Sequence, residues 1–365
     1  MSKNKRRRIA ILTGGGDCPG INAVIRAITK KAILEYDMEV IGIRDGYEGL
    51  INNQYRLLRY DDVSGILTLG GTILGTTNKA NPFQYAFKDG NQIQYEDRSD
   101  KVLKNIEDLK IECLVCIGGD GTLWISNRFY QEGVPLIGVP KTIDNDIRGT
   151  DITFGFNTAV SIATEGIDRI HTTAQSHHRI MIIEVMGRKA GWIALYSGIA
   201  GGGDIVLIPE IPYQINKIVD YINKRREKGR HFSIIVVAEG AKPLGGEVVV
   251  KKVVEESAEQ LRFGGISSVL AEQLEKMIEL ETRSVIMGHL LRGGTPTPFD
   301  RILATRLGSK AVDLIVEKQY GKMVSIKGNN LVDFPLEQVA TGPRLISPDY
   351  EFVKEGREIG VCFGN

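Results

Sequence analysis

The sequence predicts an α/β protein whose mostly parallel sheets are covered by helices on both faces. Short apolar runs alternate with longer helical patterns along most of the 365 residues, as expected for strands joined by crossover helices. Glycine-rich turns directly follow several of these runs, in the place where open α/β sheets bind ligands. The chain is also too long for one small hydrophobic core, so two domains are expected.

The composition excludes several classes of function. Hydrophobic residues make up 42% and charged residues 25% of the chain, as in an ordinary globular protein, and the formal net charge is +1. Such a balance gives no global field for nucleic acid or membranes. No run of about 18 apolar residues is present, and the apolar run after the basic residues 3–8 is too short for a signal peptide. A cytoplasmic protein is therefore expected.

Four cysteines are spread along the chain, at Cys18, Cys113, Cys116 and Cys362. Cys113 and Cys116 have the spacing of half a zinc or redox site, but no second pair completes it. They fall in a predicted strand, where residues three apart face opposite sides. We therefore expect buried, reduced thiols.

The first predicted unit is a strand, a glycine-rich loop and a helix, at Arg8–Leu12, Gly14–Gly20 and Ile21–Leu34. It resembles the start of a dinucleotide-binding fold, but Pro19 occupies the place of the third glycine of that fingerprint. Hydride chemistry is therefore disfavoured, and the loop suits a nucleoside triphosphate equally well. The later elements are expected as strands at 39–43, 114–117, 136–139, 179–185, 205–208, 233–238 and 283–287, and as helices at 102–109, 123–130, 157–171, 191–200, 215–228 and within 260–280.

The central stretch Leu114–Gly149 carries most of the candidate chemistry. Its first strand ends at Gly118-Gly119-Asp120-Gly121-Thr122, where the glycines let backbone N–H groups approach a phosphate chain closely. Asp120 offers a hard oxygen ligand for Mg²⁺, and the helix after it would point its N-terminus at the same anion. The alternative interpretation is a plain tight turn.

The second strand of this stretch ends in Pro140-Lys141-Thr142-Ile143-Asp144-Asn145-Asp146. Two carboxylates, a hydroxyl and an ammonium group thus lie just beyond a strand's carboxyl end. Alone, the segment could be a solvated loop with an Asx turn. Because it follows the strand next to the glycine loop, a functional site is the better interpretation.

Four motifs in order give the chain a family resemblance. Gly118–Thr122, Pro140–Asp146, Met186-Gly187-Arg188 and Gly288-His289-Leu290-Leu291-Arg292-Gly293-Gly294 resemble those of the 6-phosphofructokinases, and the match runs from Ile9 to about Phe334. The resemblance implies two Rossmann-like three-layer α/β/α lobes that exchange chain segments. The donor lobe would hold 1–155 and about 290–339, and the sugar-phosphate lobe would hold 156–289 and about 340–365.

The resemblance implies a glycolytic, Mg²⁺-dependent kinase that transfers a phosphoryl group from ATP to the 1-hydroxyl of fructose 6-phosphate. Asp144 would be the general base and Thr142 a donor to the transferred group. Arg188 would stabilise the charge that develops in flight. Asp120 would serve Mg²⁺, and Asp146 would serve it too or position the base.

The sugar phosphate would be held by a basic clamp and a hydroxyl-reading surface. The clamp matches Arg179, Arg283, His289 and Arg292, and the sugar would be read by Met186, Gly187, Arg188 and Glu239. In the family, the residues matching Arg179 and Arg283 come from a neighbouring subunit. The resemblance therefore implies a homo-oligomer, a dimer or tetramer with shared active sites.

The donor would be bound by Gly16, Gly119, Asp120, Gly121 and Thr122, with help from Asn78 or Lys79. Asn78 replaces a frequent arginine of the family, and Lys79 could supply that charge. The pyrophosphate-using branch typically has aspartate at position 121 and lysine at position 141, whereas many bacterial ATP-using members have glycine at both. This chain combines Gly121 with Lys141. ATP is favoured, because an acidic side chain at 121 would repel the nucleotide's α-phosphate.

Alternatives remain open from the sequence. The same reaction could use pyrophosphate, the acceptor could be a related sugar such as sedoheptulose 7-phosphate, and the chain could be a non-catalytic, effector-binding subunit. The glycine loop alone also resembles NAD and lipid kinases, but the Met-Gly-Arg and Gly-His motifs favour a sugar phosphate. An effector site between subunits would use Arg26, Lys30, Arg59, Asp204 and Arg230, which could equally be a solvated surface.

Overall fold

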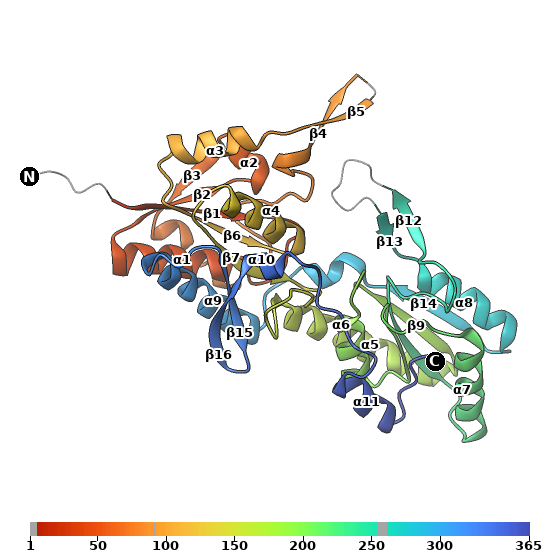
Figure 1. Cartoon of the computed structure of the whole chain (residues 1–365). Helices are drawn as coiled ribbons and strands as arrows, with labels where there is room; N and C mark the ends of the chain where they lie inside the picture. Colours follow the sequence, from red (N-terminus) through yellow and green to blue (C-terminus); the bar gives the residue numbers. More distant parts are fainter. Residues whose placement is uncertain (1–5, 91, 254–260) are drawn as a thin grey trace, which may run out of the picture.

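The computed structural model describes residues 6–90, 92–253 and 261–365. It contains two lobes, each built on one main sheet (Figure 1). The larger sheet has the order β16-β15-β7-β6-β1-β2-β3, with a short β8 (Phe154–Gly155) beside β7. Its strands are β1 (Arg8–Thr13), β2 (Glu39–Ile43), β3 (Tyr55–Leu58), β6 (Cys113–Gly118), β7 (Leu136–Thr142), β15 (Lys322–Lys327) and β16 (Asn330–Pro335).

The smaller sheet has the order β10-β11-β9-β14 and is parallel throughout. Its strands are β9 (Ile180–Val185), β10 (Ile205–Leu207), β11 (Ser233–Ala238) and β14 (Thr282–Ile286). The larger sheet is parallel except at its two ends, where β3 and β16 run antiparallel to their neighbours. Two hairpins stand apart from both sheets, β4 (Tyr85–Asp89) with β5 (Gln92–Glu96) and β12 (Val250–Val253) with β13 (Leu261–Phe263).

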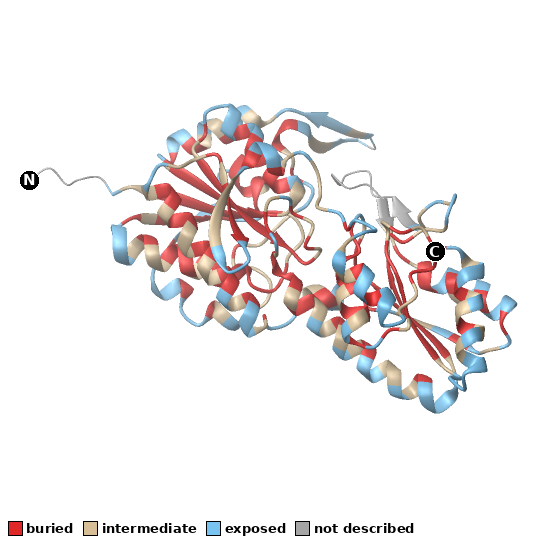
Figure 2. Ribbon diagram, turned by 60° about the horizontal axis from the view of Figure 1, so that its bottom comes forward, coloured by how far each residue is buried: buried red, intermediate tan, exposed pale blue. Residues whose placement is uncertain are grey.

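Helices cover both faces of each sheet, and the side chains of β1 show why. Ile9 and Ile11 join the core beneath α1 (Ile21–Tyr36) and α9 (Pro298–Val316), whereas Ala10 and Leu12 join the core beneath α3 (Ser99–Asp108) and α4 (Asp120–Gln131). This period of two is that of a strand buried on both sides, and Figure 2 shows the buried strands inside the helical layers. The smaller sheet lies between α5 (Phe156–His177) and α6 (Trp192–Ala200) on one face and α7 (Ile215–Glu227) and α8 (Ile266–Met277) on the other.

The chain crosses between the lobes more than once. β15 and β16 follow the strands of the smaller sheet in sequence, yet β15 pairs with β7 of the larger sheet. After α10 (Leu336–Val339) and α11 (Glu351–Glu358), Cys362 forms a parallel bridge with Ile205 beside the smaller sheet. The final segment of the chain therefore returns to the smaller sheet.

The predicted α/β class with mostly parallel sheets is confirmed, but several element boundaries were wrong, and the cause is clear for three of them. α4 begins at Asp120 rather than Leu123, because Gly119 ends the strand-to-helix turn in extended backbone. β7 continues through Pro140 to Thr142, because it gains β8 as a new partner at Lys141 and Thr142. α5 continues six residues beyond the expected end, to His177, where His178 takes up a left-handed conformation.

The longest element without a prediction from the sequence is α9, a helix of 19 residues. It packs against α1, β7, β15 and α5, so its apolar residues are not confined to one stripe. Its start did carry a signal, since Thr297 accepts a hydrogen bond from the Asp300 backbone N–H and Pro298 occupies the first turn.

The four cysteines are unpaired, and Cys18, Cys113 and Cys116 are buried as expected, whereas Cys362 is partly exposed. Cys113 belongs to the core on the α1 side of the larger sheet and Cys116 to the core on the α4 side. Burial raises the pKa of the Cys116 thiol to about 11. None of the helices in the described ranges combines the length and apolar character needed to cross a membrane.

Candidate active site

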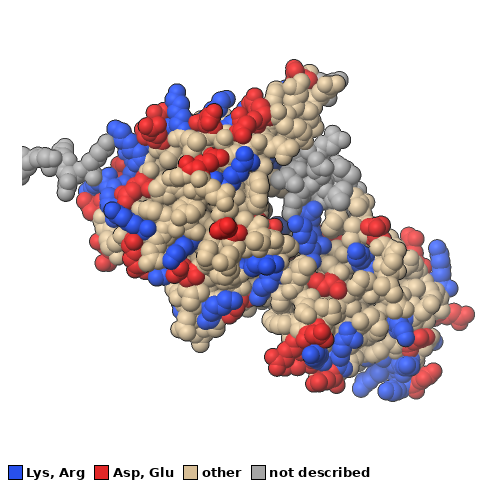
Figure 3. All heavy atoms as spheres, in the orientation of Figure 1, with Lys and Arg blue, Asp and Glu red and all other residues tan. Residues whose placement is uncertain are grey.

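The carboxyl ends of strands from both sheets meet at one place. β6 and β7 deliver Asp120 and the Thr142–Asp146 turn, while β9 and β11 deliver Arg188 and Glu239. Burial, together with the nearby negative charge of Asp144, raises the pKa of Glu239 to about 7, and Arg188 opposes this rise. Residues from the two lobes therefore share one electrostatic environment, and basic side chains gather where the lobes meet (Figure 3).

Asp144 has one carboxylate oxygen available for a ligand. Its Oδ1 atom is buried and has no hydrogen-bond partner among the described residues. The other oxygen, Oδ2, lies 3.5 Å from the Thr142 hydroxyl, and that hydroxyl accepts the Asp144 backbone N–H at 3.1 Å. A buried acceptor without a donor is costly unless a ligand supplies one. Asp144 is thus suited to accept a hydrogen bond or a proton from a substrate hydroxyl.

Three carboxylates lie close enough to affect one another. Burial raises the pKa of Asp146 to about 7, with further contributions from the negative charges of Asp144 and Asp120. Burial also raises the pKa of Asp120, and the positive charge of Lys189 opposes the shift at both Asp120 and Asp146. Lys189 was not among the predicted site residues, although it directly follows the Met186–Arg188 motif.

The acidic group fits Mg²⁺ only with a ligand's help. Among the residues that the structure describes, no three or more His, Cys, Asp or Glu side chains are arranged to hold a metal ion by themselves. Mg²⁺ keeps several waters and is usually bound by one or two carboxylates together with substrate phosphates. Asp120 and Asp146, whose ionised forms are destabilised by burial, suit this mode of binding.

The two glycine-rich loops pack against each other through Thr122. A Cβ atom at Gly118 would lie 2.2 Å from the Thr122 Cβ, and one at Gly14 would lie 2.6 Å from its Oγ1. These glycines are therefore required by protein packing as much as by a ligand. Thr122 is buried between them, so it can face a donor only through the backbone of the first turn of α4, whose N–H groups have no intrahelical acceptor.

Position 121 is open, and position 141 is not. Among the described residues, no atom lies within 4 Å of the position that a Cβ atom at Gly121 would take. Lys141 is buried and donates from Nζ to the Gly16 carbonyl at 2.5 Å, and burial lowers its pKa. Its ammonium group therefore lies under the first glycine loop. Asn78 is exposed, and Lys79 lines a small pocket of about 110 Å³ at the β4–β5 hairpin with Ala86, Phe87, Lys88 and Ile93.

The four predicted clamp residues are divided between two places. Arg292 reaches the first glycine loop, where it donates to the Asp17 carbonyl at 3.2 Å, and His289 is exposed in the same short helix, Gly288–Arg292. Arg179 and Arg283 lie instead at the amino ends of β9 and β14, where both pair with Glu281. Because β9 has six residues, about 20 Å of strand separates Arg179 from the Met186–Arg188 turn. One chain therefore does not bring Arg179 and Arg283 to Asp144.

The remaining sugar-reading residues lie beside Glu239. Met186 and Gly187 are buried directly after β9, and Gly187 has a φ of 143° and accepts the backbone N–H of Gly240. The guanidinium carbon of Arg188 lies 5.1 Å from the centre of the Phe263 ring. The turns after β9 and β11 are thus joined by their backbones.

The predicted effector residues also fall into two groups. Lys30 lies 4.0 Å above the Tyr60 ring, in the same lobe as Arg26 and Arg59. Asp204 is in the other lobe, where it pairs with Arg225 at 2.7 Å, and its pKa responds to Arg230. A combined effector site would require a second subunit.

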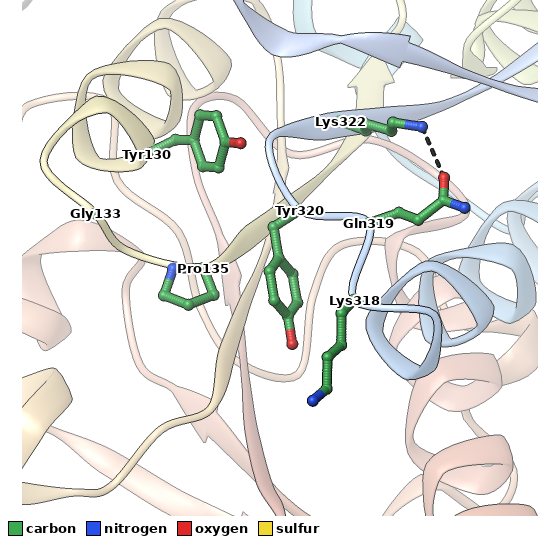
Figure 4. Close-up of a pocket in the computed structure, with 7 residues that line it drawn as sticks. All are labelled: Tyr130, Gly133, Pro135, Lys318, Gln319, Tyr320 and Lys322. Atoms are coloured by element: carbon green, nitrogen blue, oxygen red, sulfur yellow. Dashed lines mark hydrogen bonds between the residues drawn. The ribbon is translucent and has the colours of Figure 1, made fainter.

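A pocket of about 550 Å³ lies away from this chemistry (Figure 4). It is found at the amino ends of β7 and β15, whereas Asp144 follows the carboxyl end of β7. Lys322 lines this pocket, and its ammonium group already pairs with Asp333 at 2.6 Å. The pocket is lined by Tyr130, Gly133, Pro135, Lys318, Gln319, Tyr320 and Lys322.

The raised pKa of Glu239 predicts that the unliganded protein loses stability as the pH rises. In the folded chain this carboxyl keeps its proton to about pH 7, against about 4.5 for an ordinary glutamate. Between these values the folded state binds more protons, so the free energy of unfolding falls as pH increases. Replacing Glu239 by glutamine removes this dependence, which is worth up to about 3 kcal/mol.

Thermal unfolding midpoints measured between pH 5 and pH 8 test this expectation. The midpoint of Glu239→Gln relative to the original chain should increase across the interval. Glu132→Gln, which removes a surface carboxylate 4.0 Å from Arg128, controls for the change in net charge. A constant difference between Glu239→Gln and the original chain would show that Glu239 is already ionised at pH 5.

Comparisons with known proteins agree with this geometry. The family model for phosphofructokinase matches residues 8–315. The ATP-dependent 6-phosphofructokinase 2 of Clostridium perfringens is 55% identical over 361 residues, which cover 98% of this chain and 99% of that protein. A pyrophosphate–fructose 6-phosphate 1-phosphotransferase of Amycolatopsis mediterranei is 44% identical and covers 98% of this chain and all of its own length.

The fold is also found in a solved structure. The phosphofructokinase of Pichia pastoris, crystallised in the T-state, matches with a TM-score of 0.78 and 34% identity over 92% of this chain. This chain spans only 36% of that longer yeast chain. The family model, the full-length bacterial relatives and the fold together show that the chain belongs to the phosphofructokinase family.

Proposed function

We propose that this chain is an ATP-dependent 6-phosphofructokinase, which transfers the γ-phosphoryl group of ATP to the 1-hydroxyl of fructose 6-phosphate and forms fructose 1,6-bisphosphate. The observation that carries the proposal is the buried Oδ1 of Asp144 at the meeting point of the two sheets, which has no hydrogen-bond partner within the described part of the chain. The full-length relatives named for this activity support it.

In this proposal Asp144 accepts the proton of the sugar's 1-hydroxyl, and the freed oxygen attacks the γ-phosphorus. The bond between the γ-phosphorus and the β–γ bridging oxygen breaks as the new bond forms, and ADP leaves. Thr142 donates a hydrogen bond to the moving phosphoryl group, and Arg188 stabilises its developing negative charge. Asp120 and Asp146 would hold Mg²⁺ together with the donor phosphates, and the ion would supply charge neutralisation between those phosphates. Met186, Gly187 and Glu239 orient the sugar, and Arg292 and His289 lie on the side of its phosphate.

Gly121 supports ATP as the donor, because no atom from the described ranges lies within 4 Å of its Cβ position. An aspartate there would place a carboxylate beside the nucleotide phosphates. Lys141 is compatible with either donor, since its ammonium lies beneath the Gly14–Gly16 loop, where it neutralises phosphate charge. Gly16, Gly119 and the first turn of α4 would form the cradle, with Asn78 and Lys79 at its edge.

We further propose the division into lobes and the shared sites that the family resemblance implies. Residues 1–155 and about 290–339 would form the donor lobe, and residues 156–289 and about 340–365 the sugar-phosphate lobe. A homo-oligomer would complete the clamp, since Arg179 and Arg283 lie at the far edge of the smaller sheet from Arg188.

Steady-state turnover of fructose 6-phosphate with Mg²⁺ tests the proposal, with ATP and pyrophosphate compared as donors. We expect turnover with ATP and little with pyrophosphate. The variant Gly121→Asp should lose ATP turnover while remaining folded, as judged by its thermal midpoint. Preference of the original chain for pyrophosphate would contradict the Gly121 argument, and inactivity with both donors would contradict the proposed function.

A further inference from the structure

A segment near the C-terminus, residues 341–350, passes from α10 on the larger sheet to α11 on the smaller lobe. Arg344 lies in the middle of this segment and contacts the turn that carries Asp144. Its backbone N–H donates to the Asp146 carbonyl at 2.7 Å. Its guanidinium donates to the Asn145 carbonyl, from Nη2 at 2.9 Å and from Nε at 3.3 Å. Two successive peptide groups of the Asp144 turn are therefore held by one residue.

The same residue is fixed on its other side to the start of α6. The Arg344 guanidinium carbon lies 4.3 Å from the centre of the Trp192 ring, and Trp192 Nε1 donates to the Arg344 carbonyl at 3.0 Å. Glu210 joins the same two segments, because its carboxylate accepts the backbone N–H groups of Ile346 at 3.0 Å and Gly191 at 3.1 Å. α6 begins four residues after Arg188. Arg344 thus connects the turn after β7 with the chain just beyond the turn after β9.

The Asp144 turn contains a left-handed residue. Asn145 has a φ of 52°, a conformation that most residues other than glycine avoid but that asparagine adopts more readily, because its short polar side chain can form hydrogen bonds nearby. The Asn145 side-chain oxygen accepts a hydrogen bond from the Thr153 backbone N–H at 3.0 Å. The backbone carbonyl of Asn145 is the group that accepts from Arg344. An arginine is the suitable residue, because its planar group can donate two bonds to one acceptor while stacking on an indole ring.

We propose that Arg344 is a positioning residue for phosphoryl transfer, which fixes the Asp144–Asp146 turn relative to the Arg188 turn by gripping the Asn145 and Asp146 carbonyls and the Trp192 ring. This inference rests on the proposed function. Arg344 does not act on the reactants itself. It sets the direction of the Asp144 carboxylate, and a displacement of about 1 Å at a reacting group can cost about 100-fold in rate.

Steady-state kinetics of Arg344→Met and Arg344→Lys test the inference. Arg344→Met should lower kcat by about 10- to 100-fold while the KM values for ATP and fructose 6-phosphate stay within about threefold. Arg344→Lys should recover only part of the loss, because an ammonium group cannot make the paired bonds to Asn145. The matched control is Arg306→Met. Arg306 also donates from Nη2 to a backbone carbonyl, that of Asn329 at a distance of 2.7 Å, but this contact is away from the site. A kcat of Arg344→Met equal to that of this control would overturn the inference.

A second measurement does not depend on activity. Hydrogen–deuterium exchange should become faster in Arg344→Met in peptides covering both 143–148 and 186–193, and should stay unchanged in these peptides in Arg306→Met. If Arg344→Met does not fold, Trp192→Phe replaces it, since phenylalanine keeps a ring face but loses the bond to the Arg344 carbonyl. Unchanged exchange in residues 143–148 would refute the inference. If the original chain itself showed no turnover of fructose 6-phosphate, the proposed function would be refuted instead.

Discussion

Replacing Asp144 by asparagine should lower kcat by about 10²- to 10⁴-fold, the usual contribution of a general base. The amide keeps the size of the carboxylate and can still contact the sugar hydroxyl, but it cannot take the proton. We therefore expect the KM values for fructose 6-phosphate and ATP to stay within a few-fold of those of the original chain. Steady-state turnover with Mg²⁺ and saturating donor measures the effect.

Asp151→Asn is the matched control for this substitution. Asp151 lies seven residues further along the same segment, pairs with Lys327 at 2.8 Å and accepts the Gly328 backbone N–H. The Asp151→Asn variant should retain full kcat, because none of the contacts of Asp151 involves the site. An equal loss in both variants would indicate a structural effect, and a loss of less than about threefold in Asp144→Asn would remove Asp144 from the role of base.

The position of Asp144 could be predicted because it depends on local features. A buried strand followed by polar residues fixes the edge of the sheet at which those residues lie, and the alternation of strands and helices fixes the class of fold. The precise end of β7 could not be predicted. Pro140 suggests the end of a strand, yet β7 continues to Thr142 because β8, which comes 12 residues later, provides the partner.

Long-range contacts explain the other differences. α9 packs on several sides, so its sequence lacks the single apolar stripe by which helices are recognised. Arg344 supports the Asp144 turn from 200 positions further along the chain, and no motif around it indicates this contact. The family resemblance implies that Arg179 and Arg283 serve a neighbouring subunit, and the fold does place them the length of the smaller sheet away from Arg292.

The position of Arg179 and Arg283 leads to the second large effect. Both arginines lie at the amino edge of the smaller sheet, where both pair with Glu281, and neither can reach Asp144 of its own chain. If a neighbouring subunit uses them to bind the sugar phosphate, Arg179→Ala with Arg283→Ala should raise the KM for fructose 6-phosphate by at least about 100-fold, since each charge-assisted hydrogen bond contributes about 1.5–3 kcal/mol. The KM for ATP should change little.

Mixing two defective proteins separates a shared site from a site within one chain. In a hybrid of Asp144→Asn with the Arg179→Ala, Arg283→Ala double variant, one site combines the intact Asp144 of one subunit with the intact arginines of the other. Random reassociation of dimers by mild denaturation and renaturation should therefore restore about one quarter of the original activity at low fructose 6-phosphate. Each variant carried alone through the same treatment provides the control. If both groups acted within one chain, no hybrid would contain a complete site and no activity would return, so recovery requires the clamp to be supplied across a subunit interface.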